Sequence, residues 1–131
     1  MLLVKTYLDK SKIDGLGLFA GEFIPRGKVI WKFIEGFDIL LKKKEFDRLG
    51  KLSKVTNEWL STYTFYDKDF EAYVVCMDDA RFFNHSKQPN TDNSGVAVTI
   101  AKKDIARGEE LTCDYFEFDE DAALKLGRES N

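Results

Sequence analysis

The sequence predicts a small domain built mainly of β-strands, with minor helices. Short apolar or alternating segments occur along nearly the whole chain, and turns rich in glycine, proline or acids separate them. Helical patterns are confined to one central stretch and one C-terminal stretch. The 131 residues suffice for one domain with one hydrophobic core. We therefore expect residues 1–131 to form a single domain whose strands pair out of sequence order.

The N-terminal part is expected to hold three strands. Residues 2–8 alternate between apolar and polar side chains, which is typical of a strand. Residues 14–33 are expected to form two short strands around a turn at Pro25-Arg26-Gly27. Proline is favoured early in such a turn, and glycine supplies a positive φ where the turn requires it.

The central stretch, residues 38–61, is expected to be helical. Five apolar side chains fall roughly on one side of that helix: Phe46, Leu49, Leu52, Trp59 and Leu60. Gly50 is the weak point of this prediction, because glycine disfavours helix interiors.

The second half of the chain returns to strand patterns. Residues 63–66 and 72–77 are expected to be strands joined by an acidic turn. Residues 95–116 are expected to form a strand, a turn and a last strand. Residues 119–126 begin with acids and continue with good helix formers, so a closing helix is expected there.

Charge and composition exclude several classes of protein. The net charge is −3 and the pI is near 5.2, which does not fit the basic face of a nucleic-acid-binding protein. The local lysines of residues 41–54 are interpreted as a solvated helix face rather than a nucleic-acid patch. The N-terminus does not resemble a signal peptide, and no apolar run is long enough to span a membrane. We expect an intracellular protein, cytoplasmic or nuclear.

The two cysteines predict no disulfide framework. Cys76 and Cys113 both lie in apolar runs, and with one histidine in the chain they are too few for a zinc site. Buried free thiols are the favoured interpretation, which fits a reducing compartment.

Three short segments carry residue types that do chemistry. The first is DGLGLF (14–19), whose glycines permit a tight turn or close approach to a ligand. The second, NHSKQPN (84–90), holds the only histidine among side chains that stabilise irregular backbone. The third, GEELTCDYF (108–116), places a tyrosine after an acid at the end of a predicted strand. Each segment taken alone is more simply explained by structure than by function.

In their order and spacing, however, the segments resemble a known family. A GxG at residues 15–17, then RFFNHSKQPN (81–90), then GEELTCDY (108–115), are similar to the motifs of the SET-domain protein lysine methyltransferases. The resemblance spans roughly residues 4–118, with a helix expected at about 119–127. It implies a SET-domain β-clip fold, with small sheets around a knot-like core.

The resemblance also implies an activity. S-adenosylmethionine would donate methyl groups to a lysine side-chain amine of a histone or other basic protein, leaving S-adenosylhomocysteine. No metal, direct nucleic-acid contact or membrane contact is implied.

Cofactor and catalytic roles follow residue by residue from the resemblance. The Asn84 side chain and the His85 main chain would bind the cofactor, and the turn Gly15-Leu16-Gly17 would lie along it. Tyr115 matches the catalytic tyrosine and would sit beside the transferred methyl group.

For the walls of the lysine channel, the resemblance leaves more than one assignment open. Tyr63 and Tyr66 lie where the family places a channel tyrosine; Tyr63 is favoured, and a core role for both stays open. Cys113 stands where some members carry a larger residue that limits the number of methyl groups added. Phe116 and Phe118 are expected to close over cofactor and lysine.

This sequence departs from many family members, because cysteine-rich zinc segments flank neither side of its motifs. A lid would then come from Phe116, Phe118 and the final helix, or from a second subunit, so both monomer and homodimer stay open. The five acids of residues 114–121 would attract a basic peptide or would simply face solvent at a helix start. Two other functions stay open: an inactive SET-like domain that binds peptide or cofactor, and a non-enzymatic β-clip binding module.

Overall fold

Short strands in small separate sheets dominate the computed structural model, which describes residues 1–129. This confirms the predicted class. The antiparallel pair β1–β2 and the parallel pair β7–β10 form one sheet each, and the other two sheets have the orders β3-β9-β8 and β4-β6-β5. The strands are β1 (Thr6–Lys10), β2 (Leu16–Ala20), β3 (Val29–Lys32), β4 (Ile39–Leu41), β5 (Thr64–Asp67), β6 (Ala72–Val75), β7 (Asn84–His85), β8 (Thr91–Asp92), β9 (Val98–Ala101) and β10 (Thr112–Cys113).

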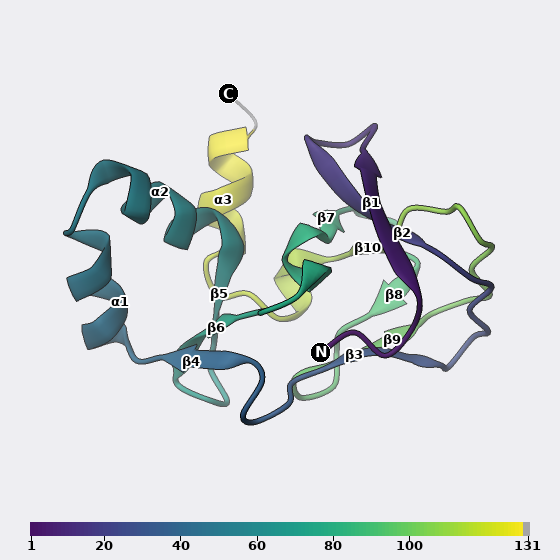
Figure 1. Ribbon diagram of the computed structural model, residues 1–131, viewed down its shortest axis with the longest axis horizontal. Coiled ribbons are helices and arrows are strands. Elements are labelled where there is room, and N and C mark those ends of the chain that lie inside the picture. The colour runs from purple at the N-terminus through teal and green to yellow at the C-terminus, as the bar shows by residue number, and fades with distance from the viewer. Residues whose placement is uncertain (130–131) are drawn as a thin grey trace.

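The helices are short, and the three α-helices gather on one side of the molecule. They are α1 (Lys43–Gly50), α2 (Lys54–Tyr63), α3 (Ala122–Glu129) and the 3₁₀ helices η1 (Asp79–Phe82) and η2 (Tyr115–Glu117). In Figure 1, α1, α2 and α3 lie opposite the β1–β2 hairpin, and β7 and β10 lie between the two sides. The pair β7–β10 therefore sits where the halves of the fold meet.

The main core lies under β2 and β3. Leu18, Ile24, Ile30, Ile105 and Leu111 are fully buried there. Two similar turns, beginning at Ile24 and at Ile105, exchange main-chain hydrogen bonds of 2.8–2.9 Å between these two residues. Each turn ends in a glycine with a positive φ, +85° at residue 27 and +92° at residue 108, where a side chain would be strained.

The central stretch differs from the single helix predicted for residues 38–61. It forms β4, then α1, then α2, with the break just after Gly50. The Ser53 side chain restarts the helix by accepting the Thr56 N–H at 3.0 Å. Leu52 lies in the link and is 68% exposed, so it does not join the expected apolar side. Phe46 does pack inward, because its ring stacks on Tyr73 with centroids 3.7 Å apart.

Candidate active site

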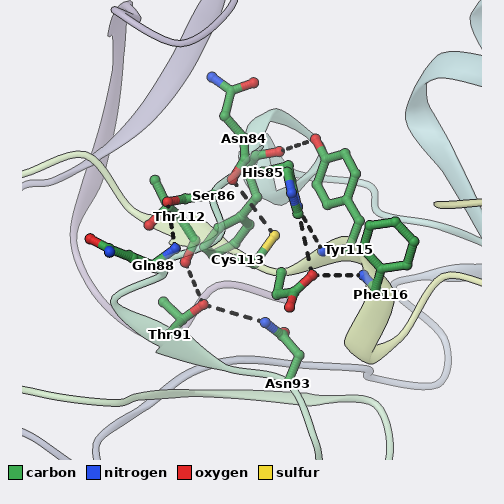
Figure 2. Close-up of polar contacts among 12 residues, drawn as sticks. Asn84, His85, Ser86, Gln88, Thr91, Asn93, Thr112, Cys113, Tyr115 and Phe116 are labelled. Carbon is green, nitrogen blue, oxygen red and sulfur yellow. Dashed lines mark hydrogen bonds and ion pairs between the residues drawn. The ribbon is translucent and has the colours of Figure 1, made fainter. Parts of the chain in front are cut away.

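The two polar motifs meet in a short parallel ladder. Asn84 pairs with Thr112 and His85 pairs with Cys113, although about 28 residues separate the partners along the chain. The side chain of Asn90 secures the ladder, because its Nδ2 donates to the Glu110 carbonyl at 2.8 Å while its Oδ1 accepts the Thr112 N–H at 2.9 Å. Figure 2 shows Asn84, His85, Cys113 and Tyr115 gathered at this junction.

Asn84 ties the glycine turn to the ladder. Its Nδ2 donates to the carbonyls of Asp14 at 3.1 Å and Leu16 at 3.2 Å, and to Glu110 Oε2 at 3.0 Å. Among residues 1–129, no hydrogen bond to the Asn84 Oδ1 is formed, so this acceptor remains available for a ligand. The Asn84 side chain therefore both fixes the turn and offers one free polar atom.

Glu110 belongs to the GEELTCDY segment, and the sequence predicted no role for it in the site. Its carboxylate accepts from the Ser11 hydroxyl at 2.8 and 2.9 Å as well as from Asn84. Gly17 faces this carboxylate so closely that a Cβ there would collide with it. Glu110 lies just before β10 (Thr112–Cys113) and faces Gly17 across the fold, and only the folded chain shows this pairing.

Tyr115 is held at both ends. Its main-chain N–H donates to His85 Nδ1 at 3.2 Å, and its hydroxyl donates to the Phe83 carbonyl at 2.8 Å. Because Nδ1 is an acceptor in this arrangement, a neutral His85 carries its proton on Nε2. The Asp114 carboxylate is 3.7 Å from Nδ1, too far for a hydrogen bond. His85 thus positions the Tyr115 backbone rather than acting on a ligand through Nδ1.

Two cavities flank Tyr115. The first, the aromatic cavity, has a volume of about 240 Å³ and is lined by Phe65, Cys113, Phe116 and Phe118 among others. The second, the glycine-turn cavity, has a volume of about 300 Å³ and lies against Asp14, Gly15, Leu16 and Asn84. Six residues line both cavities and form a shared wall: Thr62, Tyr63, Arg81, Phe83, Tyr115 and Lys125. The two cavities are therefore neighbours, and Tyr63 and Tyr115 belong to the wall that they share.

Comparison with known proteins identifies the fold family. The family model for the SET domain matches residues 15–116. The chain belongs to the SET-domain family.

The relatives of this SET domain are much longer proteins. Human histone-lysine N-methyltransferase 2B is 33% identical over an alignment of 126 positions, which covers 89% of this chain and 4% of the relative. Human histone-lysine N-methyltransferase 2D is 28% identical over an alignment of 123 positions, which covers 88% of this chain and 2% of the relative. The chain thus spans only a few per cent of the curated relatives it matches.

Solved structures agree on the fold. The crystal structure of a putative histone methyltransferase from Plasmodium falciparum superposes with a TM-score of 0.59 at 21% identity, over 87% of this chain and 95% of that one. At this identity the likeness concerns the fold alone, which matches the SET-domain architecture predicted from the motifs.

The SET domain brings most, but not all, of the expected site residues to the cavities. Gly15, Leu16 and Asn84 line the glycine-turn cavity, and Tyr63 and Tyr115 lie on the shared wall. Gly17 and His85 line neither cavity.

Of the residues expected to form the lysine channel, most also line a cavity and one does not. Cys113, Phe116 and Phe118 line the aromatic cavity. Tyr66 lines neither cavity and packs edge-on against Tyr73, with ring centroids 5.1 Å apart. Of the two candidate channel tyrosines, Tyr63 lines both cavities and Tyr66 lines neither.

Two cations of the shared wall were not predicted from the sequence. The Arg81 guanidinium lies over the rings of Trp59 and Phe82, 5.7 and 5.3 Å from their centroids. Lys125 reaches the wall from α3. Arg81 is the first residue of the RFFNHS segment, so its place in that motif could have indicated a role at the site. Nothing in the sequence around Lys125 indicates such a role.

Charge and burial set the chemistry of the aromatic cavity. Five carboxylates line it, against three cations: Asp67, Asp69, Glu117, Asp119 and Glu120 against Lys68, Arg81 and Lys125. Burial raises the pKa of the Glu117 carboxyl, and the nearby Asp92 carboxylate adds to the effect. Burial also raises the pKa of the Cys113 thiol well above its usual value, so this cysteine is an uncharged wall residue.

Among residues 1–129 no helix has the length and apolar content needed to cross a membrane.

Proposed function

We propose that this SET domain is an S-adenosylmethionine-dependent protein lysine N-methyltransferase. The observation that carries the proposal is the pair of cavities that share a wall bearing Tyr63 and Tyr115. Transfer of a group between two ligands needs an arrangement in which each enters separately and both reacting atoms meet. The relatives named as histone-lysine N-methyltransferases support the same assignment.

The glycine-turn cavity fits the cofactor. S-adenosylmethionine carries a carboxylate, an ammonium and a sulfonium, and the cavity offers both signs of charge from Asp14 and Arg81. The free Oδ1 of Asn84 supplies an acceptor, and the absence of a side chain at Gly15 lets backbone approach a ligand. When bound there, the cofactor supplies a methyl group whose bond to sulfur breaks as its bond to the lysine nitrogen forms, with the electron pair retained by S-adenosylhomocysteine.

The residues of the shared wall would align and stabilise the transfer. The Tyr115 hydroxyl donates a hydrogen bond to the Phe83 carbonyl at 2.8 Å, which fixes the position of its oxygen beside both cavities. An oxygen fixed in this way stabilises positive charge that spreads during the transfer, without having to reorganise. Tyr63 and Phe118 would orient the lysine stem and exclude water.

The target amine must lose a proton before it reacts. Free lysine has a pKa of ~10.4, and desolvation beside a positive charge lowers the pKa of the entering amine. His85 is not available for this step, because it lies off both cavities and its Nδ1 is engaged. We assign the proton to water along the channel.

The substrate would be a protein or peptide that presents a lysine on a basic segment. The excess of carboxylates around the aromatic cavity would attract such a segment. Histones and other basic intracellular proteins fit this chemistry, and the relatives' names favour a nuclear setting. The small Cys113 side chain would leave room for more than one methyl group.

Calorimetric titration with S-adenosylmethionine and S-adenosylhomocysteine is the first test, followed by mass spectrometry of lysine peptides incubated with protein and cofactor. One-site binding and a mass gain of one or more methyl groups on lysine are expected. Cofactor binding without transfer to any basic peptide would favour the inactive, ligand-binding alternative. Absence of cofactor binding, with and without a basic peptide pool, would contradict the proposal.

A further inference from the structure

A nearly buried lysine amine already occupies the shared wall. The Lys125 Nζ donates to Asp119 Oδ2 at 2.7 Å and to the main-chain carbonyl of Thr64. The side chain of Lys125 is 13% exposed and that of Asp119 is 1% exposed. Lys125 is also the only lysine among residues 1–129 that lines both cavities. Lysine is rarely buried so deeply unless it is paired, and here Thr64 and Asp119, which line the aromatic cavity beside the wall, supply the acceptors that hold the ammonium.

The groups that receive this ammonium do not belong to α3. Thr64 begins β5, and Asp119 precedes α3 with its carboxylate almost fully buried. Tyr63 and Tyr115 line the same wall, and Phe118 lines the adjoining aromatic cavity. Any primary ammonium on a chain as long as that of lysine can make the same charge-assisted hydrogen bonds.

We infer that the Asp119 carboxylate and the Thr64 carbonyl form the docking site for the ammonium of the target lysine, and that Lys125 fills this site in the substrate-free protein. The inference rests on the proposed function, whose lysine it places. It concerns capture of the protonated lysine; the amine then leaves the carboxylate and loses its proton before attack. Lys125 and Asp119 lie outside the matched residues 15–116, whereas Thr64 lies within them, so two of the three groups lie beyond the family model.

An internal competitor has a measurable consequence. A peptide binds only when Lys125 has left the site, so its apparent dissociation constant is the intrinsic constant divided by the fraction of open molecules. A site that Lys125 fills nine-tenths of the time would weaken peptide binding about tenfold. Removing the Lys125 amine should therefore tighten peptide binding, although it also removes a contact of the folded chain.

The first experiment needs no catalytic activity. Lys125→Ala deletes three carbons and the amine, and n-propylammonium replaces them. Isothermal titration should detect n-propylammonium binding to Lys125→Ala and not to the wild-type protein. Neutral n-propanol should not bind, and the added substitution Asp119→Asn should abolish the binding of the amine. Absence of binding to a Lys125→Ala protein that retains its circular dichroism, equal binding of the alcohol, or equal binding to wild type would overturn the inference.

The second experiment measures the KM of a lysine peptide. Lys125→Met keeps the apolar stem without the charge, and we expect a fall in peptide KM of at least about threefold. Lys68→Met is the matched control, because Lys68 is an exposed lysine of the aromatic cavity and its loss changes the net charge equally. Equal KM changes in the two variants would show that the loss of one positive charge near the cavity explains the effect, and would overturn the inference. If no peptide is methylated by the wild type, the proposed function fails, while n-propylammonium binding still decides the docking site.

Discussion

Replacing Tyr115 with phenylalanine removes one oxygen atom at the wall between the two cavities. The hydroxyl makes a 2.8 Å hydrogen bond to the Phe83 carbonyl in a partly buried setting. Losing such a bond costs about 1 kcal/mol of folding free energy, which lowers Tm by about 4 °C in a domain of this size. The catalytic loss should be larger, because removing one preorganised polar group at a transition state costs about a hundredfold in rate, or about 2.7 kcal/mol.

The two effects separate in one set of assays. Thermal unfolding measures the small stability loss, calorimetry measures a nearly unchanged cofactor affinity, and single-turnover methyl transfer measures the large rate loss. Tyr66→Phe is the matched control, because Tyr66 lines neither cavity. Its transfer rate should stay within about twofold of wild type. If Tyr115→Phe also transfers methyl groups within threefold of wild type, the reasoning that places its oxygen at the reaction is refuted.

Three other predictions follow from buried contacts. Asn84→Ala should raise the cofactor dissociation constant at least about tenfold in calorimetry, because it removes the free acceptor and releases the glycine turn; an unchanged constant would contradict that role. Gly17→Ala should cost about 1–3 kcal/mol in urea unfolding, because its Cβ would displace the carboxylate of Glu110 from Ser11 and Asn84; an unshifted midpoint would refute this clash. Cys76, with its pKa raised by burial to about 12, and Cys113 should both resist iodoacetamide at pH 8 in the folded protein and react in urea. Intact mass measures this, and fast labelling of either thiol in the folded state would show that it is not buried.

Much of the local architecture was predictable from short-range pattern. The alternation of residues 16–20 puts Leu18 and Ala20 into the core, as a half-buried strand requires. The glycine of the predicted turn at residues 25–27 does adopt a positive φ. The prediction of one central helix was wrong because the apolar spacing continues across a break in the helix. A strand and two short helices that pack separately can show the same spacing of apolar residues as one helix.

The candidate site was predictable as a set of residue types and not as an arrangement. Strands of two residues, such as β7 and β10, are too short to show any periodicity, so only the family motifs indicated that they matter. The choice between Tyr63 and Tyr66 could not be settled along the chain, although the sequence favoured Tyr63. It depends on where α2 ends and β5 begins, which tertiary packing decides.

The sequence alone therefore determined the β-rich class, the main turns and the motifs that indicate a SET domain, because these depend on neighbours within a few residues. The tertiary structure decided which side chains share a wall. Asn84 reaches Asp14 and Glu110, and Lys125 reaches Thr64, across separations of 26 to 70 residues. Such contacts arise from the way the small sheets pack around β7 and β10, and local pattern carries no information about that packing.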